Sequence, residues 1–435
     1  MEDLDHRVAV VGAGYAGMAA AVTLADAGVR VVVFESGAVP GGRARRVHAH
    51  GHDLDNGQHI LIGAYTELLR LMQRVGVPSD AVLRLPLELR YADGFVFRSR
   101  WLPAPLGLLG GLLALRNVSI AERLGAVRLM RSLKRRGFRF EPDIPVEKLL
   151  ETHRQAGRIG DYLWRPLCVA ALNTPPQQAS AQVFAAVLRD SLAGSQDASD
   201  LVLPRVDLSQ LFPERAAEYV RMRGGEVRTG ETVHGIEPRL RIAGESFSQV
   251  ILAVAPYQLK PFAALLGNLP DYTYQPIYTC YLQYPGRVTL PSPMLGLSAG
   301  LVQWVFDRDA LGGTPGLVSC MISAEGAHQQ MAHPELAAIC HGELAQVVKA
   351  LPRPTWSQVI AEKRATITCS PGIERPAQET PTPGLLLAGD YTDPEYPPVL
   401  EAAVRSGVRA ARKILAATPE TTPRRSSLPS SRRRA

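Results

Sequence analysis

RVAVVGAGYAG at residues 7–17 and VRVVVFE at residues 29–35 are the two runs that decide the fold. The first is a β-branched run that enters a turn with three glycines, and an alanine-rich segment joins it to the second run. Strand, glycine turn, helix, strand and a final acid within about thirty residues are the full context of the dinucleotide-binding fingerprint. The sequence therefore predicts a βαβ unit and an α/β fold built on a parallel sheet.

Each part of this unit has a physical task. Gly12 allows the tight turn, Gly14 lets the backbone approach a pyrophosphate, and Gly17 lets the helix pack closely on the sheet. The start of the helix offers unpaired N–H groups and a partial positive charge to phosphates. Glu35 ends the second strand, where its carboxylate can accept hydrogen bonds from both ribose hydroxyls. We expect these four residues to bind a nucleotide cofactor.

The loop after the acid distinguishes between cofactors. It reads PGGRARR at residues 40–46, and GG-R at this distance resembles the second phosphate contact of FAD enzymes in the amine oxidase and phytoene desaturase superfamily. Two glycines keep the loop flat, and the Arg43 guanidinium offers a fork of donors to phosphate. The resemblance makes Gly42 and Arg43 cofactor-binding residues and favours FAD over NAD, whereas Arg46 is expected in a solvated basic loop.

The composition excludes some classes of partner. The chain has 435 residues, of which 46% are apolar and 20% charged, which is enough for two or three domains with a large core. Five arginines after residue 420 supply most of the net charge of +7, and the basic-aromatic pattern of single-strand binders is absent, so we expect no nucleic-acid partner. Residues 418–435, rich in Pro, Ser, Thr and Arg, are expected to form a disordered basic tail.

Cysteine spacing and hydropathy bear on location. Five cysteines without CxxC pairs or histidines at metal spacing indicate reduced thiols, with neither disulfides nor a metal site. An acidic N-terminus leads into the first strand, so we expect no signal peptide, and no apolar run reaches the roughly 18 residues of a membrane span. These features predict a cytoplasmic protein.

A second strong motif lies near the end of the chain. GLLLAGD at residues 384–390 predicts a buried strand that ends in Gly389 and Asp390, and a proline-containing loop then leads into a helix that begins near Val399. In flavoproteins of the resembled superfamily the Asp contacts the ribityl or phosphate part of FAD. The helix start, at Val399 and Leu400, directs its dipole at the ring edge that carries negative charge in reduced flavin.

DNGQH at residues 55–59 carries a narrower resemblance. With EKRAT at residues 362–366 and the LAGDYT block, it is similar to the hydroxysqualene dehydroxylase family, the squalene-associated FAD enzymes of bacterial hopanoid synthesis. The resemblance covers residues 7 to about 417. It implies reductive removal of the allylic hydroxyl of hydroxysqualene to give squalene, with reduced FAD as the electron source and a long-chain isoprenoid as the substrate.

The resemblance also implies the domain organisation: an α/β, Rossmann-type FAD-binding domain with an inserted α+β substrate domain, as in amine oxidases. The expected FAD-binding domain is discontinuous and comprises residues 1–65, 221–260 and 367–417, while residues 66–220 and 261–366 form the substrate domain. Residues 224–236 predict a pair of strands. In the superfamily the second strand of this pair supplies backbone contacts to adenine, at the position that matches Val233.

The implied reaction needs an acid for the leaving hydroxyl. Three residues of the flavin-adjacent motifs are candidates for this catalytic role: His59, Tyr391 and Asp393. His59 has the most suitable unperturbed pKa, and we expect the turn at residues 55–57 to bring a carboxylate near enough to raise that pKa. For His59, a structural hydrogen-bonded role is equally consistent with the sequence.

Residues 101–136 bear on membrane contact. The stretch from Trp101 to Leu115 is apolar with arginines on both sides, and a helix from Ser119 to Arg136 follows. Its expected apolar face consists of Ile120, Leu124, Val127, Met130 and Leu133, and six basic residues occupy the rest. Two interpretations stay open: a peripheral contact with the inner face of the plasma membrane, or a buried wall of the substrate site.

Three alternatives to hydroxysqualene dehydroxylation stay open at this stage. One is a carotenoid or phytoene-type desaturase or isomerase, since few charges interrupt the substrate segments. Another is a flavin-dependent amine oxidase, which needs an aromatic cage for a small cation. The third is a flavin-bearing scaffold that holds other squalene-pathway enzymes together without turnover.

Overall fold

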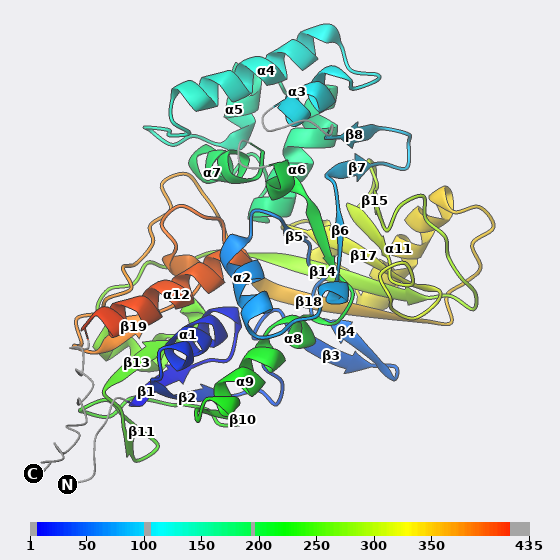
Figure 1. Ribbon diagram of the computed structural model, residues 1–435. Helices are drawn as coiled ribbons and strands as arrows, with labels where there is room; N and C mark the ends of the chain where they lie inside the picture. Colours follow the sequence, from blue (N-terminus) through cyan, green and yellow to red (C-terminus); the bar gives the residue numbers. More distant parts are fainter. Residues whose placement is uncertain (1–6, 100–105, 193–195, 418–435) are drawn as a thin grey trace, which may run out of the picture.

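A computed structural model describes residues 7–99, 106–192 and 196–417, and Figure 1 shows these residues arranged around two sheets. The first sheet has the strand order β10 (Glu226–Thr229), β2 (Arg30–Glu35), β1 (Arg7–Val11), β13 (Gln249–Leu252) and β19 (Leu385–Leu387). Every neighbouring pair in it is parallel. Its central strands are buried along almost their whole length, as expected where both faces of a parallel sheet are covered. The α/β fold predicted from the first glycine motif is confirmed.

Helices α1 (Tyr15–Asp26) and α12 (Leu400–Ala417) pack on this sheet and on each other. Their contact is close because it is made by small residues. A Cβ atom built on Gly407 of α12 would lie only 2.0 Å from the carbonyl oxygen of Ala16, and Ala19 and Ala20 of α1 are fully buried. The alanine-rich sequence of α1 therefore serves helix–helix packing as well as helix propensity.

Three further helices share the core of the parallel sheet. They are α2 (Thr66–Arg74), α8 (Leu208–Leu211) and α9 (Pro213–Met222). Leu68 of α2, Leu208 of α8 and Phe212, which joins α8 to α9, are buried in the same core as α1 and its strands. The sequence-based division assigns all three helices, apart from the last two residues of α9, to the substrate domain. Because a domain is defined by its core, we propose that the nucleotide-binding domain extends to about residue 75 and resumes at about residue 207.

The strand pair predicted for residues 224–236 forms only in part. β10 occupies Glu226–Thr229, and Gly230, with a φ of +74°, turns the chain out of the sheet. Residues 231–236 make no strand. Glu231 donates its N–H to the carbonyl oxygen of Glu35 at 2.9 Å, so the segment stays beside the end of β2. The prediction of a second strand is therefore wrong, because this segment is held by a hydrogen bond at the end of β2 and does not form the series of backbone hydrogen bonds that a strand makes.

The second sheet is antiparallel and is covered by one helix. Its order is β15 (Met294–Gly296), β16 (Trp304–Asp307), β17 (Leu317–Ser323), β14 (Tyr274–Gln283) and β18 (Trp356–Ile367). α11 (His333–Val347) packs Leu336, Cys340 and Leu344 onto it. A smaller sheet of order β5 (Leu61–Ile62), β9 (Leu201–Pro204) and β6 (Val82–Leu85) lies between the two large sheets in the view of Figure 1.

A group of helices forms the end of the molecule shown at the top of Figure 1. It contains α3 (Leu106–Leu113), α4 (Ile120–Arg135), α5 (Val146–Thr152), α6 (Arg165–Leu172) and α7 (Ala181–Leu192), preceded at α6 by a π-turn at Gly160–Trp164. Trp164 and Phe184 are fully buried among them. In the described ranges, no helix has the length and apolar character to cross a bilayer.

The first turn of α4 has the structure predicted from the sequence, whereas the buried face of the helix differs from the predicted apolar face. Ser119 and Glu122 form the capping box that their spacing predicts. The buried residues of the helix are Gly125, Ala126, Leu129 and Leu133, while Ile120 and Leu124 are exposed. The predicted apolar face is therefore wrong at its start, because small residues let α4 approach its neighbours on a different side.

The remaining elements are short. They are β3 (Arg46–Ala49), β4 (His52–Asp55), β7 (Glu88–Arg90), β8 (Val96–Arg98), β11 (Arg241–Ile242), β12 (Glu245–Ser246) and α10 (Ala263–Leu266). All five cysteines lie in described residues and are free, which confirms the absence of disulfides between them.

Candidate active site

One cavity of about 970 Å³ runs from the carboxyl ends of β1 and β2 to the helices at the end of the molecule. Its first part is lined by the glycine loops at residues 12–17 and 41–43 and by Glu35. Its far part is apolar, with a lining that includes Leu87, Leu89, Leu167, Val187, Met294 and Trp304. The cavity therefore joins a nucleotide-like end to a hydrophobic end, and polar side chains lie between them.

The glycine turn after β1 has no room for a side chain at Gly12 or Gly17. Gly12 has a φ of +103°, and a Cβ atom on it would lie 2.7 Å from the carbonyl oxygen of Ala253. A Cβ atom on Gly17 would lie 1.9 Å from the carbonyl oxygen of Gly12. Gly14 faces the second glycine loop, and its added Cβ would be 3.8 Å from the Cα of Gly42. Two stretches of bare backbone thus face each other at the start of α1, a cradle that fits a pyrophosphate.

Glu35 closes this end of the cavity. Its carboxylate accepts hydrogen bonds from the backbone N–H groups of Ala13 at 2.8 Å and Gly37 at 2.7 Å. These contacts fix the side chain at the mouth of the glycine turn, where a ribose would follow the pyrophosphate. Glu231 and Val233 line the cavity at the same end. The backbone contact of Val233 with adenine stays a proposal.

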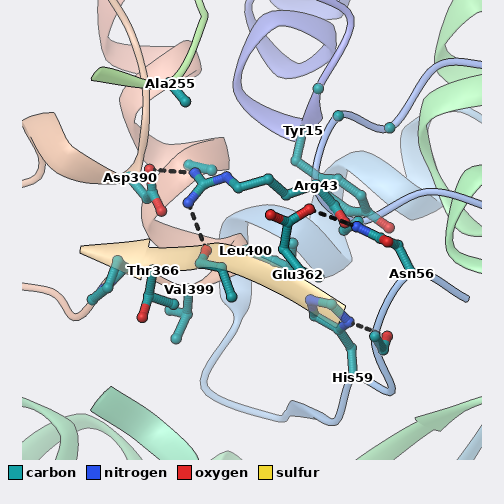
Figure 2. Close-up of a pocket in the computed structure, with 18 of the residues that line it drawn as sticks. Tyr15, Arg43, Asn56, His59, Ala255, Glu362, Thr366, Asp390, Val399 and Leu400 are labelled. Atoms are coloured by element: carbon teal, nitrogen blue, oxygen red, sulfur yellow. Dashed lines mark hydrogen bonds and ion pairs between the residues drawn. The ribbon is translucent and has the colours of Figure 1, made fainter. Parts of the chain in front are cut away.

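Arg43 spans the cavity between two distant segments. Its Nη1 donates to the carbonyl oxygen of Ala365 at 2.7 Å, and its Nη2 donates to Oδ1 of Asp390 at 2.8 Å (Figure 2). These contacts use two of the five N–H groups of the guanidinium, so the side chain can hold a further anionic group. Arg46 lies elsewhere: it pairs with Asp207 and Glu214 and holds the loop to α8 and α9.

The start of α12 faces the same space. Gly389 and Asp390 follow the last strand of the parallel sheet, and Val399 and Leu400 line the cavity at the start of the 18-residue helix. Figure 2 shows Asp390, Arg43, Val399 and Leu400 around one region of the cavity. A helix start carries a partial positive charge, which suits an electron-rich ring edge. The residues predicted to bind the cofactor therefore all line one cavity, apart from Gly17, which packs α1 against the turn.

The DNGQH motif builds the polar wall between the two ends. Asp55 is buried, and its Oδ1 accepts the N–H of Leu208 at 2.8 Å. Burial raises the pKa of Asp55 to about 6, although Arg308 opposes the shift. Oε1 of Gln58 accepts from Nη1 of Arg308 at 2.9 Å. Asp55 thus does not line the cavity, whereas Asn56, Gln58 and His59 do, and Arg308 holds the side-chain amide of Gln58.

His59 differs from its expected role as an acid. Its Nδ1 lies 2.7 Å from the carbonyl oxygen of Gly57. A carbonyl oxygen can only accept, so Nδ1 carries the proton. Burial lowers the pKa of His59, and Arg43 lowers it further. The prediction that a carboxylate raises this pKa is therefore wrong, because Asp55 turns away toward Leu208. In the neutral ring, Nε2 is an acceptor.

Tyr391 and Asp393 do not line the cavity among the residues that the structure describes. Tyr391 lies in the core on the face of the parallel sheet opposite α1, where burial raises its pKa. Asp393 is buried and pairs with Arg409 at 2.8 Å, which holds the pKa of its carboxyl below the ordinary value although burial opposes this. The geometry therefore does not support the catalytic role expected for these two residues, because the turn after Asp390 points them into the core.

Sequence reasoning missed several residues of the polar wall. Glu362 lines the cavity, and its Oε2 accepts from Nδ2 of Asn56 at 2.9 Å. Thr366 lies nearby, and its Oγ1 accepts from Nδ2 of Asn173 at 3.0 Å. The EKRAT and DNGQH motifs contained the signal for Glu362 and Asn56. Their meeting across more than 300 residues depends on the pairing of strands, which no local pattern reveals.

The chain is similar to known flavoproteins over nearly its whole length. Residues 15–415 match the family model described as flavin containing amine oxidoreductase. The chain is 30% identical over 439 residues to the hydroxysqualene dehydroxylase of Rhodopseudomonas palustris, covering 95% of this chain and 99% of that protein. It is 28% identical over 435 residues to the hydroxysqualene dehydroxylase of Sinorhizobium fredii, covering 95% and 100%.

The chain is also similar to two more distant proteins. The zeta-carotene desaturase of a Synechocystis species is 25% identical over 487 residues, covering 94% of this chain and 97% of that protein. A solved structure of a putrescine oxidase variant shares the fold with a TM-score of 0.70 and 18% identity, covering 95% and 99%. The family match, the near full-length identity and the cradle of glycine loops agree. The chain is an FAD-dependent oxidoreductase that belongs to the flavin containing amine oxidoreductase family and, within it, to the hydroxysqualene dehydroxylases.

Proposed function

We propose that this enzyme removes the allylic hydroxyl of hydroxysqualene reductively and releases squalene. The observation that carries the proposal is the cavity itself, in which the FAD-binding loops open directly into a chamber lined by Leu87, Leu167, Val187, Met294 and similar residues. Such a lining suits a long isoprenoid chain. The relatives that match nearly the whole chain with 27–30% identity carry the name of this activity.

The protein contributes binding, orientation and exclusion of water. We assign the pyrophosphate of FAD to Gly12, Gly14 and Gly42, the ribose to Glu35, the adenine to the backbone at Val233, and the ribityl side to Arg43 and Asp390. The start of α12, at Val399 and Leu400, would then lie at the ring edge. Bound FAD in its reduced form supplies the hydride that replaces the hydroxyl. The apolar chamber holds the allylic carbon in a fixed place and keeps bulk water away.

We assign His59 to the orientation of the substrate hydroxyl. Its Nδ1–H is bound to the carbonyl oxygen of Gly57, which fixes the ring and leaves Nε2 as an acceptor on the cavity side (Figure 2). A hydroxyl that donates its hydrogen to Nε2 presents its oxygen lone pairs to a proton donor. His59 is therefore a positioning residue in this proposal.

Product analysis tests the function against its alternatives. Anaerobically reduced holoenzyme is mixed with hydroxysqualene, and oxidised holoenzyme with zeta-carotene or putrescine. We expect squalene from the first mixture and no conversion in the other two. Desaturated carotenoid would move the enzyme to the desaturases, peroxide with putrescine would indicate an amine oxidase, and bound flavin that cycles with none of the three would favour a scaffold.

A second part of the proposal concerns the membrane. Leu113, Ile120 and Leu124 are exposed at 49%, 72% and 43%, and they lie together at the α3–α4 end of the molecule. Arg128 and Arg131 continue the exposed stripe along α4. Apolar tips with a basic flank suit the interface of an anionic bilayer. We propose that this end contacts the membrane in which the isoprenoid is dissolved. The stretch at residues 100–105 lies outside the described residues.

Vesicle binding tests this contact. We expect the holoenzyme to co-sediment with vesicles that contain anionic lipid, and binding to fall with added salt. The variant Arg128→Glu/Arg131→Glu should lose roughly tenfold or more in affinity, because each basic residue near an anionic surface contributes about 1 kcal/mol. The control Arg239→Glu/Arg353→Glu makes the same change in net charge at exposed sites outside α3 and α4. Equal losses in both variants would contradict a specific contact through α4.

A further inference from the structure

We infer that Glu362 is the proton donor to the hydroxyl that leaves the substrate, and that Asn56 positions its carboxyl group. The inference deepens the proposed function and rests on it, because the donor acts only on a leaving hydroxyl. His59 leaves this task open, since its cavity-side nitrogen is an acceptor.

Glu362 reaches the cavity because β18 is irregular at this point. Glu362 pairs with Ile277 of β14, and the next pair is Thr366 with Gln275, so the register shifts between the two pairs. Glu362, Ala365 and Thr366 all line the cavity as a result, and the carbonyl oxygen of Ala365 turns to Arg43. Irregularities of this kind occur often beside active sites, where they re-aim side chains.

Neutral donors hold the carboxyl group of Glu362. Nδ2 of Asn56 donates to Oε2 at 2.9 Å, and the backbone N–H of Arg364 donates to Oε1 at 3.2 Å. The same Nδ2 donates to the carbonyl oxygen of Arg43 at 2.9 Å, so both amide hydrogens of Asn56 are engaged and its orientation is fixed. Figure 2 shows the carboxyl group between Asn56 and Arg43, on the side of the cavity where His59 lies.

The other carboxylates of the cavity are committed elsewhere. Glu35 accepts two backbone N–H groups at the glycine turn. Asp390 pairs with Arg43 at 2.8 Å, and Glu231 lies 4.0 Å from Arg228 at the far end of the nucleotide site. In the described part of the chain no ion pair joins Glu362 to a cation, although Arg43 interacts with its carboxyl group electrostatically at longer range.

The step balances with the groups already named. The proton of the Glu362 carboxyl passes to the hydroxyl oxygen as the C–O bond breaks. Both electrons of that bond stay with oxygen, and water leaves. Hydride from the reduced cofactor, as proposed above, forms a C–H bond at the allylic carbon that lost oxygen. The Glu362 carboxylate regains a proton from solvent.

A substrate whose leaving group needs no proton distinguishes proton donation by Glu362 from a structural role of this residue. Reduced holoenzyme is mixed with hydroxysqualene or with its allylic chloride, in single turnover across a range of pH. We expect Glu362→Gln to slow the alcohol by roughly 10²-fold or more and to react with the chloride at the wild-type rate. The wild-type rate with the alcohol should fall as pH rises, and the variant should lack this limb. Glu335→Gln, at an exposed site on α11, is the matched control.

An infrared measurement without turnover and a substitution of the positioning residue test the inference in two further ways. Infrared spectra of the holoenzyme with squalene bound should show a protonated carboxyl band that Glu362→Gln lacks, while its FAD content and melting temperature match the wild type. Asn56→Ala should slow the alcohol but keep the pH limb, because it loosens the carboxyl group without removing it.

The outcomes distinguish the two proposals. A wild-type enzyme that converts neither substrate would overturn the proposed function. A wild type that converts the alcohol, together with a Glu362→Gln variant that keeps its rate and pH limb or loses the chloride reaction equally, would overturn the inference alone.

Discussion

At the residue scale, the polar wall of the cavity depends on side chains whose protonation is set by burial and by their fixed partners. Asp55 is turned outward to the N–H of Leu208, and His59 is turned inward with its proton on Nδ1. The two residues are only four positions apart, yet burial shifts their pKa values in opposite directions, upward for the acid and downward for the base. In both cases burial favours the neutral form.

Asp55 should make stability depend on pH. Its folded pKa of about 6 lies above the ordinary 3.8. The stabilising contribution is therefore complete below about pH 4 and is lost as pH rises toward 6, with an upper limit of about 3 kcal/mol. The Asp55→Asn variant lacks this pH-dependent loss of stability. The melting temperature of the variant minus that of the wild type should therefore increase between pH 4 and 6.5. A difference that stays constant over this range would show that the carboxyl group does not titrate there.

His59→Gln tests the positioning role. Because the ring is neutral and accepts through Nε2, its replacement should slow single turnover by roughly tenfold while leaving the shape of the pH profile unchanged. The measurement is the rate of flavin oxidation by hydroxysqualene in the reduced holoenzyme. A loss of 10²-fold or more together with loss of the high-pH limb would instead make His59 the proton donor, as its sequence context first suggested.

At the scale of elements, the close contact of α1 with α12 couples the first motif of the sequence to the last. Gly407 lets α12 approach Ala16, and a Cβ atom there would lie 2.0 Å from a carbonyl oxygen that cannot move without α1. This contact places the start of α12 beside the glycine turn. The two motifs that we propose bind FAD therefore share one packed pair of helices.

Gly407→Ala should destabilise the holoenzyme by about 1–3 kcal/mol, because the helices must separate. Gly342→Ala is the control, since this residue of α11 is exposed and an added Cβ atom would have no neighbour within 4 Å. That change should stabilise the protein by about 0.4–1 kcal/mol through helix propensity. Thermal unfolding measures both. Similar melting temperatures for the two variants would mean that α1 and α12 are not held at this distance.

The elements that the sequence predicted well are the local ones. The βαβ unit at residues 7–35 and the capping box at Ser119 depend on neighbours within a few residues, and both form as expected. The strand pair predicted after Gly224 forms only in part, because Gly230 has a positive φ and turns the chain out of the sheet. The buried face of α4 includes Gly125 and Ala126 and leaves out some of its largest apolar residues.

The candidate site was predictable where its residues belong to the same local motifs. Glu35, Arg43 and Asp390 all line the cavity. The proton donor was not predictable, because Glu362 enters the cavity through a register shift between β14 and β18 and meets Asn56 from a distant part of the chain. Tyr391 and Asp393 follow Asp390 in the sequence, but one turn of backbone directs them into the core.

At the scale of the whole molecule, the two sheets and the end helices enclose one continuous space with two chemical characters. The parallel sheet presents backbone N–H groups and a helix start to the end of this space where we propose that FAD binds, while the antiparallel sheet and the helices supply apolar walls. The exposed apolar tips of α3 and α4 lie in the helical part that also lines the chamber. Figure 1 shows this part at the opposite end of the molecule from β1 and β13. Such an arrangement suits an enzyme that takes a lipid at one end and holds its flavin at the other.

The central claim is that the hydroxyl of the substrate is replaced by hydride from bound reduced FAD. The most direct measurement is an anaerobic titration of the reduced holoenzyme with hydroxysqualene in deuterated buffer, in which the exchangeable hydrogen of the reduced flavin becomes deuterium. We predict that one equivalent of substrate oxidises one equivalent of flavin and yields squalene with a single deuterium at the carbon that lost oxygen. Squalene without deuterium at that carbon, or flavin that stays reduced while the alcohol is consumed, would contradict the account.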